Sequence, residues 1–301
     1  MSKISATIVA DSLSPQGDRL TSVLVTFPRI ILSEINTHRM LSKNTSSSRA
    51  IPFKKMVEAI ENDPFIPIAW QRDHSGMQGT EYLTGDINIA FVHDLWLEAR
   101  NRAIKSAKAL NTEGADKIPL VTKQLCNRLL EPFMWTTMLI TGSKEGWDNL
   151  FELRNPVYEW EYEEGIIKAK SKEEFLEMFI QRYPTNGERD LHDWEAVDEN
   201  FDPVDSNFWR SINKGQAEIH MMALAEKIYD AVNESTPKQL KAGEWHIPFE
   251  DKINIDGVQG LKFTLKDGST KYVEAKWITG YKVKISTAMA AHTSYTIVGG
   301  E

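Results

Sequence analysis

The stretch LTSVLVTFPRIILSEINTHRMLSKNTSSSR, residues 20–49, combines three local patterns in succession. Residues 20–27 are rich in β-branched and apolar side chains and predict a strand that ends at Pro28. Proline has a fixed φ and no N–H group, so it suits the first position of a helix, and we expect a helix from Pro28 to about Leu41. Residues 42–49 contain no apolar side chain and predict a polar loop.

The predicted helix ends with basic side chains on its apolar side. Ile31 and Ile35 mark the buried face, which continues one turn further with His38 and Arg39. Arginine is rarely buried without a partner. Periodicity alone leaves two interpretations open. Either Arg39 reaches solvent at a helix end while His38 bonds a carbonyl, or both side chains belong to a binding site.

The loop that follows favours a binding site. Its hydroxyl and amide side chains are small enough to leave backbone N–H groups accessible, and Arg39 and Arg49 flank them. Arginine offers a two-pronged charged donor that suits phosphate. A serine-rich solvated linker is the alternative. The chain has neither a GxGxxG motif nor a GxxxxGK motif followed by Ser or Thr, so the sequence supports neither a Rossmann site nor a P-loop.

Outside this segment the sequence predicts a mixed α+β chain. Strands are expected at 3–10 and 133–140, and an irregular stretch at 63–85. The apolar periodicity of residues 87–111, which includes Phe91 and Leu95, predicts a helix. Further expectations are helices at 53–62, 118–131, 147–154 and 212–232, and a strand-rich region at 250–296 with an Asp-Gly turn at 267–268.

Composition is that of a soluble globular chain of 301 residues, enough for one large domain or two small ones, with 41% hydrophobic and 26% charged residues. No apolar run approaches the roughly 18 residues of a membrane span, and the first residues lack a signal-peptide pattern, so a cytoplasmic location is expected. The single Cys126 excludes an internal disulfide and multi-cysteine metal sites. It has no neighbouring histidine and is expected to be a core thiol.

The negative charge is concentrated in one segment. Residues 155–205 hold 15 acidic against 5 basic side chains, a net of −10, so the rest of the chain contributes +2 to the total of −8. That remainder can host an anion site, but it has no basic stripe for long nucleic acid. Aromatic residues such as Trp160 and Phe175 are too frequent for a disordered tail, so we expect a small folded insertion. The histidines show no paired spacing, and no metal site is predicted.

Residues 38–49 resemble the signature R-H-R-x-x-S-x-N-x-x-S-x-R of flavin-dependent thymidylate synthases. Six of its seven fixed positions match in order and spacing, and Thr37 replaces the first arginine. Residues 36–40 and 46–52 are similar to the branch of the family common in phages. Segments at 128–132, 149–154, 216–219 and 243–248 are similar to further family motifs, so the resemblance covers roughly 18–154 and 211–250.

This resemblance implies an α+β fold with a twisted, mostly antiparallel sheet and flanking helices. It divides the chain into a catalytic core (1–154 and 211–250), an acidic insertion (155–210) and a strand-rich C-terminal part (251–301). Members convert dUMP to dTMP with FAD, NADPH and methylenetetrahydrofolate, usually as homotetramers whose sites are shared among subunits.

The resemblance also assigns roles to single residues. Flavin hydride makes a cysteine nucleophile unnecessary, so no catalytic nucleophile is assigned. By matched position, FAD would be contacted by His38, Arg39 and Asn149, and the nucleotide by Asn44, Ser47, Ser48, Arg49, Arg128 and Arg154.

Departures from the family pattern leave alternatives open. The family's N-x-R flavin contact falls on Ser143 and Glu145, and residues 290–295 are only similar to its A-R-V-S-F segment. No S-P-F-E-H segment is found. A truncated chain, a split protein completed by a second polypeptide, or a divergent enzyme would each explain this. Alternatives to dTMP formation are C5 hydroxymethylation, action on dCMP, or a nucleotide-binding protein that has lost flavin chemistry.

Overall fold

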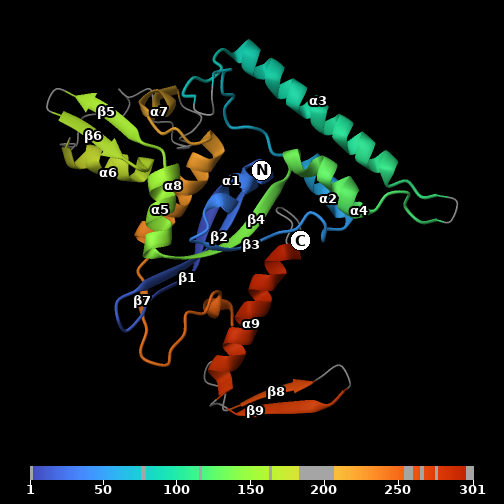
Figure 1. Cartoon of the computed structure of the whole chain (residues 1–301), viewed down its shortest axis with the longest axis vertical. Coiled ribbons are helices and arrows are strands. Elements are labelled where there is room, and N and C mark those ends of the chain that lie inside the picture. The colour runs from blue at the N-terminus through green and yellow to red at the C-terminus, as the bar shows by residue number, and fades with distance from the viewer. Residues whose placement is uncertain are drawn as a thin grey trace, which may run out of the picture.

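The computed structural model describes residues 3–75, 79–114, 117–162, 165–182, 207–253, 260–264, 268–274 and 277–295. Its centre is a five-stranded sheet in the order β3-β4-β2-β1-β7 (Figure 1). Neighbouring strands are antiparallel except β1 and β7, which are parallel. The α+β class and the mostly antiparallel sheet are therefore confirmed. The strands are β1 (Ser5–Leu13), β2 (Arg19–Pro28), β3 (Ser42–Thr45), β4 (Trp135–Ser143) and β7 (Lys238–Gln239).

One face of the sheet forms the main core. Val23, Val25 and Phe27 alternate along β2, as the two-residue period of a strand requires, and all three are fully buried. Helices α5 (Lys144–Arg154) and α8 (Ile219–Glu234) cover this face (Figure 1). After β2, the 3-10 helix η1 (Arg29–Ile31) and the short helix α1 (Leu32–Thr37) add Ile31 and Ile35 to the same core, as predicted.

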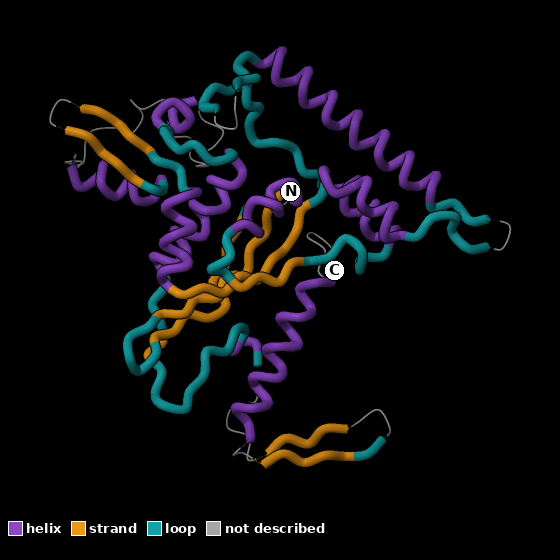
Figure 2. Tube along the Cα trace, in the orientation of Figure 1, coloured by secondary structure: helices purple, strands orange, loops and turns teal. Residues whose placement is uncertain are grey.

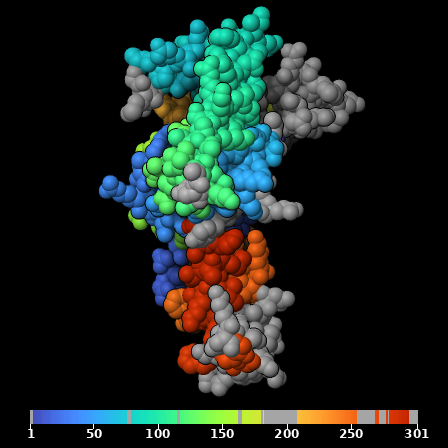
Figure 3. Space-filling view, turned by 90° about the vertical axis from the view of Figure 1, so that its right-hand side faces the viewer, coloured from blue at the N-terminus to red at the C-terminus, as the bar shows by residue number. Residues whose placement is uncertain are grey.

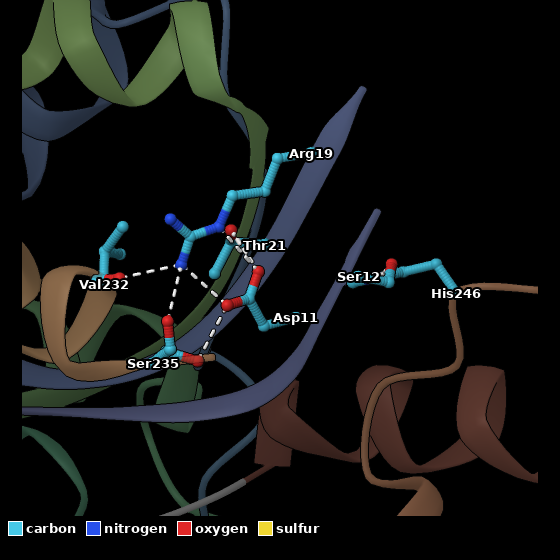
Figure 4. A network of polar contacts seen from close by, with 7 residues as sticks. All are labelled: Asp11, Ser12, Arg19, Thr21, Val232, Ser235 and His246. Atoms are coloured by element: carbon cyan, nitrogen blue, oxygen red, sulfur yellow. Dashed lines mark hydrogen bonds and ion pairs between the residues drawn. The ribbon is translucent and has the colours of Figure 1, made fainter. Parts of the chain in front are cut away.

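A polar network fastens the end of α8 to the first two strands (Figure 4). Arg19 donates two hydrogen bonds to Asp11, of 3.0 and 2.7 Å, and a third of 2.7 Å to the Val232 carbonyl. Thr21 and Ser235 donate to the same carboxylate. Burial raises the pKa of Asp11, but the hydrogen bonds from Arg19, Ser235 and Thr21 outweigh it, so the pKa lies below its usual value.

The opposite face of the sheet is covered near His246. Its ring lies between two serine hydroxyls, with Nδ1 2.7 Å from Ser12 Oγ and Nε2 2.9 Å from Ser22 Oγ. Burial lowers the pKa of His246. A neutral imidazole has one donor and one acceptor, so the two serines take opposite roles. The contact ties the segment after β7 to β1 and β2.

A second core lies beside the edge of the sheet. It packs α2 (Phe53–Asn62) against the C-terminal half of α3 (Asp86–Leu110), and both helices agree with the prediction. Cys126 is fully buried there, as expected of a core thiol. The single helix predicted at 118–131 is wrong. The chain instead forms α4 (Lys123–Cys126) and the 3-10 helix η2 (Asn127–Phe133), which contains Pro132, a residue that lacks an N–H donor.

Helix α3 is attached along one side only. Trp96 Nε1 donates to the Phe65 carbonyl at 2.8 Å, and Ile104 and Ala107 are buried in the second core. Phe91 and Leu95, two of the periodic apolar residues, are exposed. The periodicity of the helix is therefore real, but within the described chain its apolar residues are divided between an attached and an open side.

The acidic insertion contains its own small core. It comprises β5 (Tyr158–Tyr162), β6 (Gly165–Ala169), α6 (Lys172–Arg182) and α7 (Asn207–Ile212), and it packs around Phe175 and Trp209. A folded insertion was predicted, and the described part confirms it. Residues 183–206 lie outside the described residues.

The base of the insertion is closed by its two ends. Lys214 N donates to the Val157 carbonyl at 2.7 Å, and Val157 N donates to Asn213 Oδ1 at 3.1 Å. Lys172 Nζ also lies 3.0 Å from Glu226 Oε2 of α8, and both side chains are buried. The insertion is therefore joined to the core by backbone pairing and by one buried ion pair.

The C-terminal part is only partly strand-rich. The strands β8 (Gly260–Thr264) and β9 (Thr270–Glu274) form a hairpin away from the main sheet (Figure 2). Residues 278–292, expected within the strand-rich region, form helix α9 (Ile278–His292), followed by η6 (Thr293–Tyr295). The turn residue Asp267 lies outside the described residues. Among the described helices, none has the length and apolarity needed to cross a bilayer.

Candidate functional site

The signature residues begin where α1 ends. The helix stops at Thr37 rather than near Leu41 as predicted. Thr37 Oγ1 donates to the Glu34 carbonyl at 2.6 Å, a local side-chain bond that competes with continued helical pairing. His38 and Arg39 therefore lie beyond the helix and do not share its buried face. His38 is buried and Arg39 is exposed.

His38 holds Arg154 at the end of α5. Arg154 Nε donates to His38 Nε2 at 3.0 Å, which requires an unprotonated Nε2. Burial first, and then the positive charges of Arg154 and Lys43, lower the pKa of His38 to about 4. The imidazole is therefore neutral at pH 7. Two residues that are 116 positions apart, and that the resemblance assigned to one site, are in direct contact.

Carboxylates complete this end of the site. Glu34 Oε2 lies 4.0 Å from Arg154 Nη1. Burial and the negative charge of Glu218 raise the pKa of Glu34, although Arg154 lowers it. Glu218 caps α8 by accepting from the N–H groups of His220 and Met221 at 2.9 and 3.0 Å. Glu218, which lies in the 216–219 motif, is therefore close enough to Glu34 to raise its pKa.

The predicted polar loop is partly a strand. Residues 42–45 form β3, which pairs with the outer edge of β4. The backbone groups of β4 require partners, and this requirement outweighs the lack of apolar side chains in the segment. Beyond β3, Ser46 and Ser48 are buried, whereas Ser47 is half-buried and Arg49 is exposed.

The buried serines support the structure. Ser46 Oγ lies 2.7 Å from Thr136 Oγ1, and Ser48 Oγ donates to Glu131 Oε1 at 2.5 Å. Asn127 Nδ2 donates to the Ser48 carbonyl at 2.6 Å. The Ser48 hydroxyl, which the sequence assigned to substrate, is thus engaged by Glu131. Ser47 and Arg49 are the members of this turn that reach the surface.

The end of α9 packs against the signature. Ser47 N donates to the Ser294 carbonyl at 2.9 Å, and Asn44 Nδ2 donates to the Ala290 carbonyl at 2.5 Å. Ser294 Oγ donates to Asn44 Oδ1 at 3.1 Å. Residues 290–295, which are similar to a second family motif, therefore lie beside residues 44–47. The amide of Asn44 is used in this contact.

A cleft with two arginines opens next to this turn. Its volume is about 520 Å³, and its lining includes Arg29, Arg128 and Glu131 together with Ser33 and Asn36 of α1. Arg29 Nη2 lies 3.5 Å from Glu131 Oε1. Burial lowers the pKa of Arg29, and the nearby charge of Arg128 lowers it further. Two guanidinium groups face one carboxylate, so the cleft carries net positive charge and suits an anion.

Arg29 and Glu131 are functional candidates that the sequence interpretation did not select. Arg29 follows the proline that ends β2, and Glu131 precedes Pro132. An arginine immediately after a buried strand is a recognisable signal. The contact between the two side chains depends on tertiary folding and cannot be read from their spacing of about 100 residues.

The remaining predicted residues lie on the outer surface. Within the described chain, the exposed side chains of Arg39, Arg49 and Asn149 make no hydrogen bond or ion pair. A Cβ built on Gly146 of α5 would lie 3.2 Å from the Met40 carbonyl oxygen, so glycine lets the segment after His38 approach α5. Arg39 precedes Met40 in the chain, and Asn149 follows Gly146 by about one helical turn.

No protein-family model matches the sequence, and no curated protein matches it. Two solved structures with partial similarity are complexes of a UMP/dUMP methylase, PolB, from Streptomyces cacaoi. The complex with 5-Br dUMP is 12% identical, with a TM-score of 0.39 over 51% of this chain and 79% of that chain. The complex with 5-Br UMP is 14% identical, with a TM-score of 0.37 over 52% and 78%.

Proposed function

We propose that this chain binds a pyrimidine deoxynucleotide and transfers a one-carbon unit to C5 of its base, forming dTMP from dUMP. Methylenetetrahydrofolate and NADPH would be the co-substrates and FAD the cofactor. One observation carries the proposal: the signature segment, residues 38–49, contacts both Arg154 and residues 290–294. Three sequence segments that resemble parts of one family site thus meet in space, which a chance match would not require.

The nucleotide phosphate would lie at the arginine cleft. Arg29 and Arg128 supply positive charge there, and the outward residues of the turn, Ser47 and Arg49, supply further donors. Arginine keeps its proton even when burial lowers its pKa, so the charge of the cleft persists at neutral pH. Arg154, held by the neutral His38, would contact the nucleotide from the other side of α1.

The residues present fit FAD in their chemistry. Arg39 and Asn149 are exposed donors on the two chain segments that meet at Gly146 and Met40, and the guanidinium suits the pyrophosphate. Bound FAD would supply hydride for reduction of the transferred carbon. Here His38 would fix the orientation of Arg154. Because Arg39 and Asn149 are exposed, a second copy of the chain would complete the flavin site.

Binding of nucleotide without flavin is the second candidate. It is favoured by the start of α5, where Ser143 caps the helix by accepting from Gly146 N at 3.4 Å and Glu145 is exposed. At these two positions the resembling family has a flavin contact that includes an arginine. A carboxylate in place of that arginine would repel the flavin pyrophosphate.

Visible absorption and calorimetry together test both candidates. Purified protein supplied with FAD should show flavin bands after desalting and should bind dUMP. Replacement of Arg128 by alanine should weaken dUMP binding by about 10- to 100-fold, the value of one hydrogen bond to a charged group. Lys55→Ala removes an exposed cation of α2 and should leave binding unchanged.

Each outcome of this experiment selects one function. dUMP binding without flavin would favour the second candidate, and absence of both would refute the proposal. If both bind, the mass of the product from dUMP and from dCMP separates methylation from hydroxymethylation and identifies the base.

A further inference from the structure

We propose that two copies of this chain associate through α3, with the two helices antiparallel and the acidic half of each facing the basic half of the other. This inference concerns a surface remote from the nucleotide cleft and does not depend on the proposed function. It rests on an open apolar strip, on the separation of charge along that strip, and on the position of a small residue between the two charged halves.

The open side of α3 carries large apolar side chains at helical spacing. Ile87, Phe91 and Leu95 follow one another at intervals of four and are 87%, 64% and 46% exposed. Residues spaced by three, four or seven share one face of a helix. Figure 3 shows α3 along the surface of the molecule, with nothing in the described chain covering it. A strip of this kind on a soluble protein marks an interaction site.

Charges on the same face are segregated by sign. Asp94 and Glu98 lie in the N-terminal half, and Arg102 and Lys105 lie in the C-terminal half, at successive intervals of four, four and three. The side chains of Asp94, Glu98 and Arg102 are 82%, 53% and 76% exposed. Glu98 and Arg102 already form an ion pair of 2.5 Å within the helix.

Only an antiparallel pair satisfies these charges. If the two helices cross at about position 100, next to Ala99, Glu98 lies opposite Arg102 of the second copy and Asp94 lies opposite Lys105. Parallel pairing would instead place each charge against its own equivalent. Ala99 is exposed and small, which lets the helix axes approach at the centre.

The same register also pairs the apolar ends. Phe91 of one helix lies opposite Leu110, 40% exposed, at the end of the other. The interface has two equivalent halves, one on each side of the crossing point, which we call its arms. The helix is about 37 Å long, so both arms fit along it.

We therefore infer that the partner of this surface is a second copy of the chain. An interface with a two-fold axis requires a patch that is complementary to itself, and the acid-then-base order on one face has that property. A different partner would need matching charge on its own surface, but it would not require the symmetry about Ala99.

Charge reversal tests the pairing by sedimentation velocity over a concentration series. The wild-type chain should show a reversible monomer–dimer equilibrium. Asp94→Lys/Glu98→Lys and Arg102→Glu/Lys105→Glu should each sediment as monomers, because both arms of each homodimer then repel. An equal mixture of the two variants should form a heterodimer, since both of its arms are complementary. The quadruple variant should regain the homodimer.

The control is Asp148→Lys/Glu152→Lys on α5, which reverses two exposed acidic side chains at the same spacing. This variant should associate like the wild type. Far-UV circular dichroism verifies that all variants are folded. Monomeric wild-type protein at every concentration, unchanged association of the two α3 variants, or failure of the mixture to associate would each overturn the proposal.

Discussion

Replacement of His38 by glutamine should remove part of the pH dependence of stability. The pKa of His38 is about 4 in the folded chain, lowered by burial and by Arg154 and Lys43, against an ordinary value of 6.5. Between these values the unfolded chain binds a proton that the folded chain does not. The free energy of unfolding therefore rises with pH across this window. The contribution is fully present above about pH 6.5 and is lost as the pH falls through about 4.

The size of the effect follows from the two pKa values. At about 1.4 kcal/mol per pH unit, the difference between 6.5 and about 4 gives at most roughly 3.5 kcal/mol. Arg154, which faces the ring, is a quarter exposed, so solvent screens part of this interaction. We expect about 2 kcal/mol. Glutamine keeps an oxygen that can accept from Arg154 Nε and removes the titration.

Urea unfolding of wild type and His38→Gln over a pH series measures this contribution. The two curves of stability against pH should coincide above pH 6.5, where both side chains are neutral, and the wild type should fall about 2 kcal/mol below His38→Gln as the pH drops to about 4. Arg154→Gln removes one of the neighbouring charges and should raise the pKa of His38, which NMR of the labelled imidazole reports. Parallel stability curves, or titration of His38 near 6.5 in the wild type, would refute the reasoning.

Three further changes test the packing around the site. Lys172→Met should lower the free energy of unfolding by about 3–5 kcal/mol because it leaves Glu226 buried without its cation, whereas Lys172→Met/Glu226→Met should lose much less; urea unfolding compares them. Burial, the charge of Asp230 and a hydrogen bond with Glu234 raise the pKa of Glu173 to about 7, so Glu173→Gln should be more stable than wild type above pH 7 and equal to it below pH 4.5 in thermal melts at each pH. Ser48→Ala should cost about 1 kcal/mol in the same unfolding assay, since Glu131 loses a donor, and no loss would contradict the buried bond.

The central sheet was predictable because its signals are local. The run of β-branched residues in β2 and the apolar run in β4 both indicate buried strands, and Pro28 marks the end of β2. The strand at 42–45 was not predictable from its own residues, because it forms to pair with the free edge of β4. The early end of α1 coincides with a side-chain bond from Thr37 to the Glu34 carbonyl, which apolar periodicity does not reveal.

The sequence supplied candidate residues for the site but not their arrangement. The signature selected His38 and the 149–154 motif selected Arg154, and the fold places these two side chains in contact. The signature did not separate the buried Ser48 from the surface residue Arg49, since both are polar in a polar segment. The contact of Arg29 with Glu131 joins two distant elements, and no periodicity encodes such a contact.

The paired ends of the insertion bear on how such a chain evolves. Lys214 and Val157 meet at the point where the excursion leaves and rejoins the core. A genetic event that removed the intervening residues would leave two ends already within bonding distance, so a short linker would reconnect them. The module can therefore be gained, lost or exchanged in one step while the sheet and its arginines keep their places.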